Sequence, residues 1–180
     1  MEKVLNLKKY GKALWTRDLA KDIREELNNL LSGISIGDVV VIDATGVEVF
    51  DYSFANELFG KSLFGLGNEY PGKFLVVEGL TTYTRENLIK ALESLNLAMI
   101  ERKKGKVEII GKIHPAYQET FKVIAAIKDS ISANTLKDKL NINLTAANER
   151  LVKLTAMGLV RREKATSTAG REQFLYSALR

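Results

Sequence analysis

The 180-residue chain contains no cysteine and only one histidine, His114. The lack of cysteine excludes disulfides, thiolate metal sites and cysteine nucleophiles. With a single histidine, a zinc site would need a cluster of carboxylates, and no such cluster stands at ligand spacing. A lone histidine beside Pro115 is more often structural or solvated than a ligand or a base. We therefore expect no metal and no cofactor.

Long apolar runs are also missing. No stretch approaches the roughly 20 apolar residues that a membrane-spanning helix needs. The N-terminus alternates lysine with apolar residues and lacks the apolar core of a signal peptide. These absences predict a cytoplasmic protein without a membrane partner.

The positive charge is distributed unevenly along the chain. Residues 1–112 contain 16 lysines and arginines and 16 acidic residues, whereas residues 113–180 contain 11 and 6. The net charge of +5 therefore lies entirely in the C-terminal third, which favours two domains, 1–112 and 113–180. A basic module beside a neutral domain is typical of nucleic-acid binding, because cationic side chains displace counterions condensed on phosphates. The alternative is a solvated basic face.

Strand and helix patterns alternate in residues 1–112. Residues 39–42 are continuously apolar, which predicts a strand covered on both faces. Leu19, Ile23, Leu27 and Leu31 recur every four residues, as in an amphipathic helix that ends near Gly33. We expect further strands at residues 73–78, 99–102 and 107–110, a helix from residues 51–53 through 63, a surface loop at 64–72, and a helix capped by Thr84. The alternation predicts an α/β (α+β) fold with a mixed sheet and helices.

One stretch of this region has a family resemblance. It reads Val40-Val-Ile-Asp-Ala-Thr-Gly-Val-Glu-Val-Phe-Asp-Tyr-Ser-Phe-Ala-Asn-Glu-Leu-Phe59. This stretch resembles the central strand, loop and helix start of STAS domains. It is closest to STAS-like domains of unassigned function. In anti-sigma factor antagonists the corresponding loop reads Asp-Ser-Ser-Gly, and a partner kinase phosphorylates its second serine. Asp51 and Ser53 match this pattern, while Tyr52 and Phe54 depart from it.

The resemblance implies a signalling domain in which Ser53, with Asp51, is the candidate phosphoacceptor or switch. The implied partner is a histidine-kinase-like ATPase. A phosphate at a helix N-terminus is favoured by the helix dipole and changes the local surface charge. The alternative is that Ser53 is only a helix N-cap.

Residues 113–180 predict helices followed by two strands. Pro115 suits the first turn of a helix. Leu136 and Leu140, and then Ala147, Leu151 and Leu154, give two apolar helical stripes on either side of residues 141–143. Asn143 is a suitable N-cap for the second helix, and Gly158 a suitable stop. We expect strands at 160–165 and 173–177, joined by a polar tip at residues 166–170.

A second stretch with a family resemblance covers residues 140–160. It reads Leu-Asn-Ile-Asn-Leu-Thr-Ala-Ala-Asn-Glu-Arg-Leu-Val-Lys-Leu-Thr-Ala-Met-Gly-Leu-Val. This stretch resembles the turn, recognition helix and exit of bacterial and archaeal winged helix-turn-helix regulators. The resemblance implies a small winged-helix domain whose second helix enters the major groove of double-stranded DNA. The candidate DNA-binding residues are Thr145, Asn148, Glu149, Arg150, Lys153, Arg161, Arg162, Lys164 and Arg171. Asn148 can recognise an adenine edge, whereas Glu149 must accept from a cytosine amino group or pair with a neighbour such as Lys153.

Together these features favour a DNA-binding transcriptional regulator whose STAS-like domain receives a protein or phosphorylation signal. Because one module offers few contacts, we expect a homodimer. The alternative is an interaction switch of the anti-sigma antagonist kind, with the winged helix as a dimerisation or docking module. We do not expect an enzyme, because Ser53 has no evident base.

Overall fold

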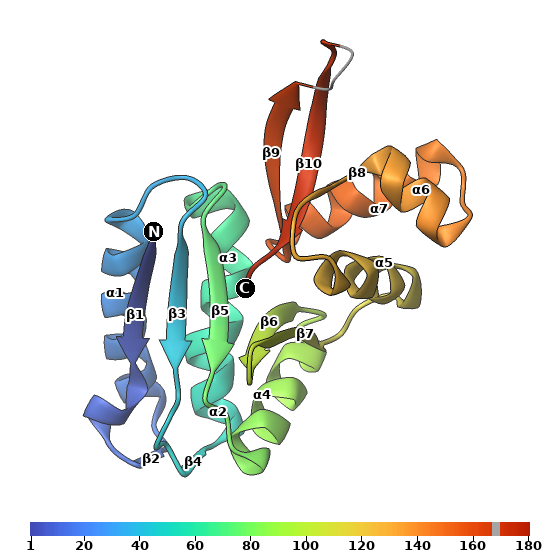
Figure 1. Cartoon of the computed structure of the whole chain (residues 1–180). Coiled ribbons are helices and arrows are strands. Elements are labelled where there is room, and N and C mark those ends of the chain that lie inside the picture. The colour runs from blue at the N-terminus through green and yellow to red at the C-terminus, as the bar shows by residue number, and fades with distance from the viewer. Residues whose placement is uncertain (167–169) are drawn as a thin grey trace.

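A mixed five-stranded sheet forms the centre of the molecule. The computed structural model describes residues 1–166 and 170–180. The strand order is β1-β3-β5-β6-β7, in which the first four strands are parallel and the last is antiparallel (Figure 1). The strands span Glu2–Asn6, Val39–Asp43, Phe74–Glu78, Ala98–Lys103 and Lys106–Gly111. The expected mixed sheet is therefore confirmed. The turn between β6 and β7 is formed by Lys104 and Gly105, both with positive φ.

The central strand β3 is buried on both faces, as its continuous apolar sequence predicts. Val40 and Ile42 belong to one hydrophobic cluster, and Val39 and Val41 belong to another on the opposite face. Side chains alternate across a strand, so four successive apolar residues require a cover on each side of the sheet. Two layers of helices supply these covers.

The first layer consists of helices from residues 1–112. They are the 3₁₀ helix η1 (Leu7–Tyr10), α1 (Arg17–Ser32), α2 (Tyr52–Ala55), the π-helix η2 (Asn56–Gly60), α3 (Lys61–Glu69) and α4 (Thr82–Ser94). A short parallel pair, β2 (Ala13–Leu14) and β4 (Val49–Phe50), lies near the carboxyl ends of the parallel strands (Figure 1). Thr16 caps α1 by accepting from the backbone N–H of Leu19.

Two expectations for this layer are wrong. The helix that begins after Asp51 continues through η2 and α3 to Glu69, so the expected surface loop at residues 64–72 is helical over its first six residues. Helix α4 is capped by Thr81 rather than Thr84. The hydroxyl of Thr81 accepts from the backbone N–H of Thr84, whose own hydroxyl accepts from the N–H of Thr81, forming a capping box.

The second layer consists of residues 113–180. It contains α5 (Pro115–Ala126), β8 (Ile131–Ser132), α6 (Ala133–Leu140), α7 (Leu144–Ala156), β9 (Val160–Thr166) and β10 (Glu172–Ala178). The strands form an antiparallel sheet in the order β8-β10-β9. Phe121, Ile124 and Leu179 share one buried cluster with Val76 and Ile100 of the central sheet. The C-terminal segment therefore completes the core of the central sheet.

Arg102 on β6 fastens the end of the chain to the sheet. Its guanidinium donates to the carbonyl oxygens of Leu179, at 3.1 Å, and Arg180, at 2.6 Å, and pairs with Glu2 at 2.6 Å. The hydrogen bond from Arg102 lowers the pKa of the Glu2 carboxyl, and partial burial opposes this shift. Arg180 in turn donates to the carbonyl oxygens of Ala125 and Ile127 at the end of α5. This set of contacts ties the sheet, the C-terminus and α5 together.

No helix within residues 1–166 and 170–180 is long and apolar enough to cross a bilayer.

Replacing Arg102 should destabilise the fold. We expect Arg102→Met to lower the free energy of unfolding by about 2 kcal/mol, because two carbonyl oxygens and a carboxylate lose a charged donor. The measurement is urea unfolding followed by circular dichroism. Lys103→Met, at the exposed next position, is the matched control and should change stability by less than about 0.5 kcal/mol. Equal effects of the two substitutions would contradict the role given to Arg102.

The Glu2 to Arg102 pair also predicts a pH dependence. Because the folded pKa of Glu2 is lowered, its stabilising contribution is present above its unfolded pKa and is lost as pH falls through the folded value. The difference in unfolding free energy between the wild type and Glu2→Gln should therefore shrink on acidification below about pH 4.5. A difference that stays constant from neutral pH to about pH 3 would contradict this linkage.

Candidate nucleic-acid interface

Helices α6 and α7 are joined by a short turn whose geometry is fixed by local hydrogen bonds. The hydroxyl of Ser132 accepts from the N–H of Thr135 and caps α6. Asn141 ends α6 in the left-handed conformation, with φ of 51°. The side chain of Asn143 then accepts from the N–H of Ala146 at 2.8 Å and starts α7, as expected. These caps set the direction in which α7 leaves the turn.

Helix α7 has one buried and one exposed side. Ala147, Leu151 and Leu154 are completely buried in the second hydrophobic cluster, which confirms the expected apolar stripe. Thr145, Asn148, Glu149, Val152 and Lys153 are exposed on the other side. Gly158, with φ of 70°, ends the helix as predicted. The candidate recognition residues on this helix, apart from Arg150, are therefore accessible in the single chain.

Strands β9 and β10 form a hairpin that projects beyond the helices (Figure 1). The register places Arg162 opposite Tyr176 and Lys164 opposite Phe174. The guanidinium of Arg162 lies 4.5 Å from the centre of the Phe174 ring. Burial raises the pKa of the Tyr176 hydroxyl, although the neighbouring Arg162 acts in the opposite direction. The hairpin therefore presents a cation, Arg162, that is supported by an aromatic ring.

A groove of about 240 Å³ separates the start of α7 from β10. Leu144 and Asn148 line it from the helix, while Gln173, Phe174 and Tyr176 line it from the strand. Ser132, Ala133 and Asn134 also line it. Asn148 thus lies at the junction of helix and hairpin, where one ligand can contact both.

The structure does not bring all the predicted residues to this surface. Arg150 turns toward α5, where it pairs with Glu119 at 3.1 Å and reaches the carbonyl oxygen of Ala116 at 3.5 Å. Arg161 extends over the Phe74 ring of the central sheet, 5.8 Å from its centre.

Lys164 and Arg171 are exposed on the hairpin. Residues 167–169 of the expected polar tip lie outside the described part of the chain. Within that part, no ion pair joins Glu149 to Lys153.

The second predicted site, Asp51 and Ser53, lies elsewhere. Its helix, α2, follows the carboxyl ends of the parallel strands, and the β9–β10 hairpin projects at the other end of the molecule (Figure 1). The N-cap is Asp51, whose carboxylate accepts from the N–H of Phe54 at 2.7 Å, so the N-cap interpretation of Ser53 is wrong. Ser53 is half-buried in the first turn, and the hydroxyl of its exposed neighbour Tyr52 bonds Ser94.

Several residues of the interface were not predicted from the sequence. Strand β8 has two residues, too few for a periodic signal. Leu144 and Phe174 are exposed apolar residues beside the groove, and their sequence positions resemble those of ordinary core residues.

His114 is the N-cap of α5, where its Nδ1 accepts from the N–H of Ala116. Among residues 1–166 and 170–180, no three His, Cys, Asp or Glu side chains are grouped to hold a metal ion.

The environment of Arg150 predicts a structural effect that Lys153 does not share. We expect Arg150→Ala to lower the free energy of unfolding by about 1 kcal/mol, because Glu119 and the carbonyl oxygen of Ala116, in the first half of α5, lose a half-buried partner. Lys153→Ala, exposed on the same helix, should leave stability within about 0.5 kcal/mol of wild type. Urea unfolding of both variants tests this, and a larger loss for Lys153→Ala would be the opposite result.

No protein-family model and no curated protein matches the chain. Among solved structures, a possible transcriptional regulator from Methanosarcina mazei Go1 is similar over 38% of this chain, with 14% sequence identity and a TM-score of 0.35. The match spans 57% of that protein. Similarity at this level does not indicate a shared function.

Proposed function

We propose that residues 113–180 form a winged helix-turn-helix domain that binds double-stranded DNA. The observation that carries the proposal is the pairing of an exposed α7 side with the β9–β10 hairpin across one groove. The order of α5, β8, α6, α7 and the two hairpin strands agrees with that of a winged helix. The surplus positive charge of the whole chain lies in the same segment.

In this proposal the start of α7 enters the major groove. An α-helix fits the width of that groove, and its N-terminal residues then meet the base edges. Asn148 has the amide geometry for a bidentate contact with adenine, and Thr145 can reach a phosphate or a base. Arg162 and Lys164 on the hairpin contact the backbone phosphates. Two such modules, supplied by a homodimer, provide enough contacts for a specific site.

Residues 1–112 act as a STAS-like signalling domain in the same proposal, and the protein is not an enzyme. Ser53 stands at the start of α2, where the dipole of the helix favours an added phosphate. A histidine-kinase-like ATPase is the partner suited to that reaction. Because Ser53 is half-buried, the kinase must contact α2 together with the exposed Tyr52.

A second function is favoured by exposed apolar side chains. Val152 is 51% exposed, and Leu144 and Phe174 are also exposed near the groove. Apolar residues on an accessible surface are typical of protein-binding sites. The alternative function is therefore an anti-sigma-antagonist-like interaction switch, in which this surface docks a protein or a second copy of the chain.

The two functions predict different responses to duplex DNA. For the DNA-binding function, the full chain should bind a fluorescent random duplex, with affinity that falls steeply between about 50 mM and about 200 mM salt. Lys164→Ala should weaken binding to all duplexes and reduce the slope of log K against log salt by about 0.9, because one phosphate contact is lost. Fluorescence anisotropy measures both quantities.

Lys90→Ala provides the matched control. Lys90 is an exposed cation on α4, in the other helical layer, and its substitution makes the same change in net charge. The Lys90→Ala substitution should leave the affinity for duplex DNA and the slope of log K against log salt unchanged. If the wild-type chain binds no duplex at either salt concentration, the DNA-binding proposal is rejected, and loss of self-association in Val152→Lys would then support docking.

A further inference from the structure

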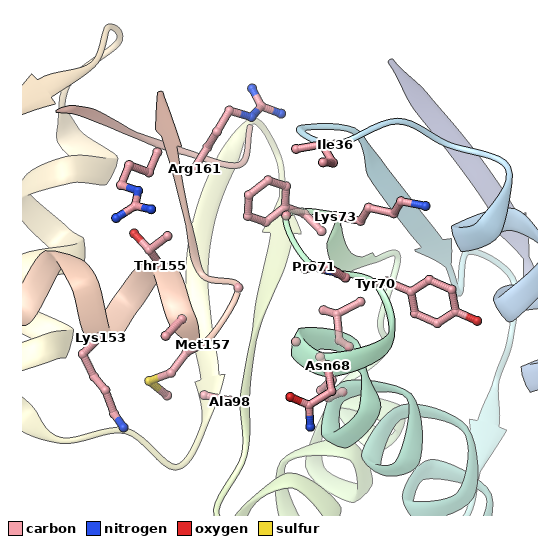
Figure 2. Close-up of a pocket in the computed structure, with 18 of the residues that line it drawn as sticks. Ile36, Asn68, Tyr70, Pro71, Lys73, Ala98, Lys153, Thr155, Met157 and Arg161 are labelled. Atoms are coloured by element: carbon pink, nitrogen blue, oxygen red, sulfur yellow. The ribbon is translucent and has the colours of Figure 1, made fainter. Parts of the chain in front are cut away.

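A cleft of about 800 Å³ lies where the two layers meet (Figure 2). One wall comes from α3 and residues 70–74, and the other comes from the end of α7 and the start of β9. Figure 2 shows Lys153, Thr155 and Met157 on one side and Asn68 and Pro71 on the other. The volume falls within the range of small-molecule sites, about 300–1,000 Å³. The cleft is separate from the groove between α7 and β10.

The wall from α3 and its exit loop is largely apolar. Leu63, Phe64, Tyr70 and Pro71 contribute to it, and Ile36 extends it from the loop before β3. Phe64 is 77% exposed and Ile36 is 80% exposed, so two large apolar side chains meet solvent at this site. An apolar ligand body placed here would remove that surface from water, which favours binding.

The opposite wall is cationic. Lys153, Arg161 and Arg162 line it, and Glu163 is the only acidic lining residue among the described residues. Among residues 1–166 and 170–180, no carboxylate forms an ion pair with Lys153, Arg161 or Arg162. Within the same residues, the buried Nε–H of Arg161 has no hydrogen-bond acceptor. The fourth lining cation, Lys73, already donates to the carbonyl oxygen of Leu31 at 2.7 Å.

We propose that this cleft binds a small organic anion with an apolar body, such as a fatty carboxylate or an alkyl phosphate. The apolar part packs on α3 and its exit loop, while the anionic head meets Lys153 and Arg162 on the other wall. The two walls supply complementary halves of one amphipathic ligand. The anionic head is common to both ligand types, so competition between them identifies the preferred head group.

The first test compares two fluorescent probes with the same aromatic skeleton. 8-Anilinonaphthalene-1-sulfonate carries an anionic group, and N-phenyl-1-naphthylamine lacks it. The intact chain should bind the sulfonate at least about tenfold more tightly, because only the sulfonate can form charge-assisted contacts with the cationic wall. Decanoate and decyl phosphate should displace it, and their relative potency reports the head group. Equal affinity for the two probes would overturn the proposal.

A pair of double variants separates this site from general charge attraction. Lys153→Ala with Arg162→Ala should weaken sulfonate binding about tenfold and leave binding of the neutral probe within about twofold. Lys122→Ala with Lys128→Ala makes the same change in net charge at exposed positions outside the cleft lining. This control should retain wild-type affinity for both probes. Equal losses in the two double variants would contradict a specific site.

A third variant fills the cleft without changing charge. A Cβ built at Gly67 on α3 lies 3.9 Å from the carbonyl oxygen of Ala156, so a side chain there extends between the walls. Gly67→Leu should abolish binding of both probes. Gly65→Leu is the control, since Gly65 is on the same helix but does not line the cleft, and its nearest neighbour is the movable end of Glu69. Unchanged binding by a folded Gly67→Leu protein would also overturn the proposal.

The cleft and the proposed DNA surface share α7 and β9, and this part of the inference rests on the proposed function. Saturating decanoate should change the affinity of the full chain for duplex DNA by about tenfold, as expected for a typical coupling free energy. The probe titrations contain no DNA, so absence of DNA binding and absence of ligand binding give separate results. An unchanged duplex affinity in the presence of bound decanoate would reject the coupling.

Discussion

The two-sided burial of the central sheet determines the rest of the structure. Strands β3 and β5 carry apolar side chains on both faces, and each buried valine contributes about 2 kcal/mol relative to exposure. Helices α1 to α4 cover one face, and only residues 113–180 cover the other among the described residues. The C-terminal segment therefore covers the second face of the central strands of the sheet. Its orientation is fixed by the same burial that stabilises the sheet.

This constraint has a direct consequence for α7. The side that carries Ala147, Leu151 and Leu154 is buried, so the side that carries Thr145, Asn148 and Val152 is turned outward. The hairpin is held beside it by Tyr176, which is buried in the same cluster. An outward helix side and a projecting hairpin are thus positioned by packing inside the molecule. The proposed interface depends on this arrangement more than on any single charged residue.

The junction of the two layers is held at one end by hydrogen bonds and is open at the other. Arg102 connects β6 to the carbonyl oxygens of Leu179 and Arg180. At the cleft, Leu66 lies near Gly158, and Gly67 lies near the carbonyl oxygen of Ala156. A ligand in the cleft would contact both layers without breaking the Arg102 contacts. Because Arg162 lines the cleft and also belongs to the proposed DNA surface, such a ligand would affect the outward surface through this shared side chain.

Local features of the fold could be predicted from the sequence, and contacts between distant residues could not. The apolar run of β3 and the cap by Asn143 follow from short patterns and are confirmed. The helical continuation to Glu69 was missed because two glycines in α3 look like a loop signal, although packing offsets their low helix propensity. Thr81 and Thr84 are both good caps, and the backbone angles decide between them. Arg150 and Arg161 are DNA-binding candidates by their charge and their place in the winged-helix pattern, but their actual partners, Glu119 and Phe74, are far away in the sequence.

The most direct test of the central claim is amide chemical-shift mapping of the labelled full chain during titration with duplex DNA. If the outward side of α7 and the hairpin form the interface, the largest shifts will occur at Thr145, Asn148 and Glu149 and along β9 and β10. The amides of α1 and α4, in the other layer, will be unaffected. Saturable shifts centred on α1 or α4, or no shifts at low salt, would contradict the account.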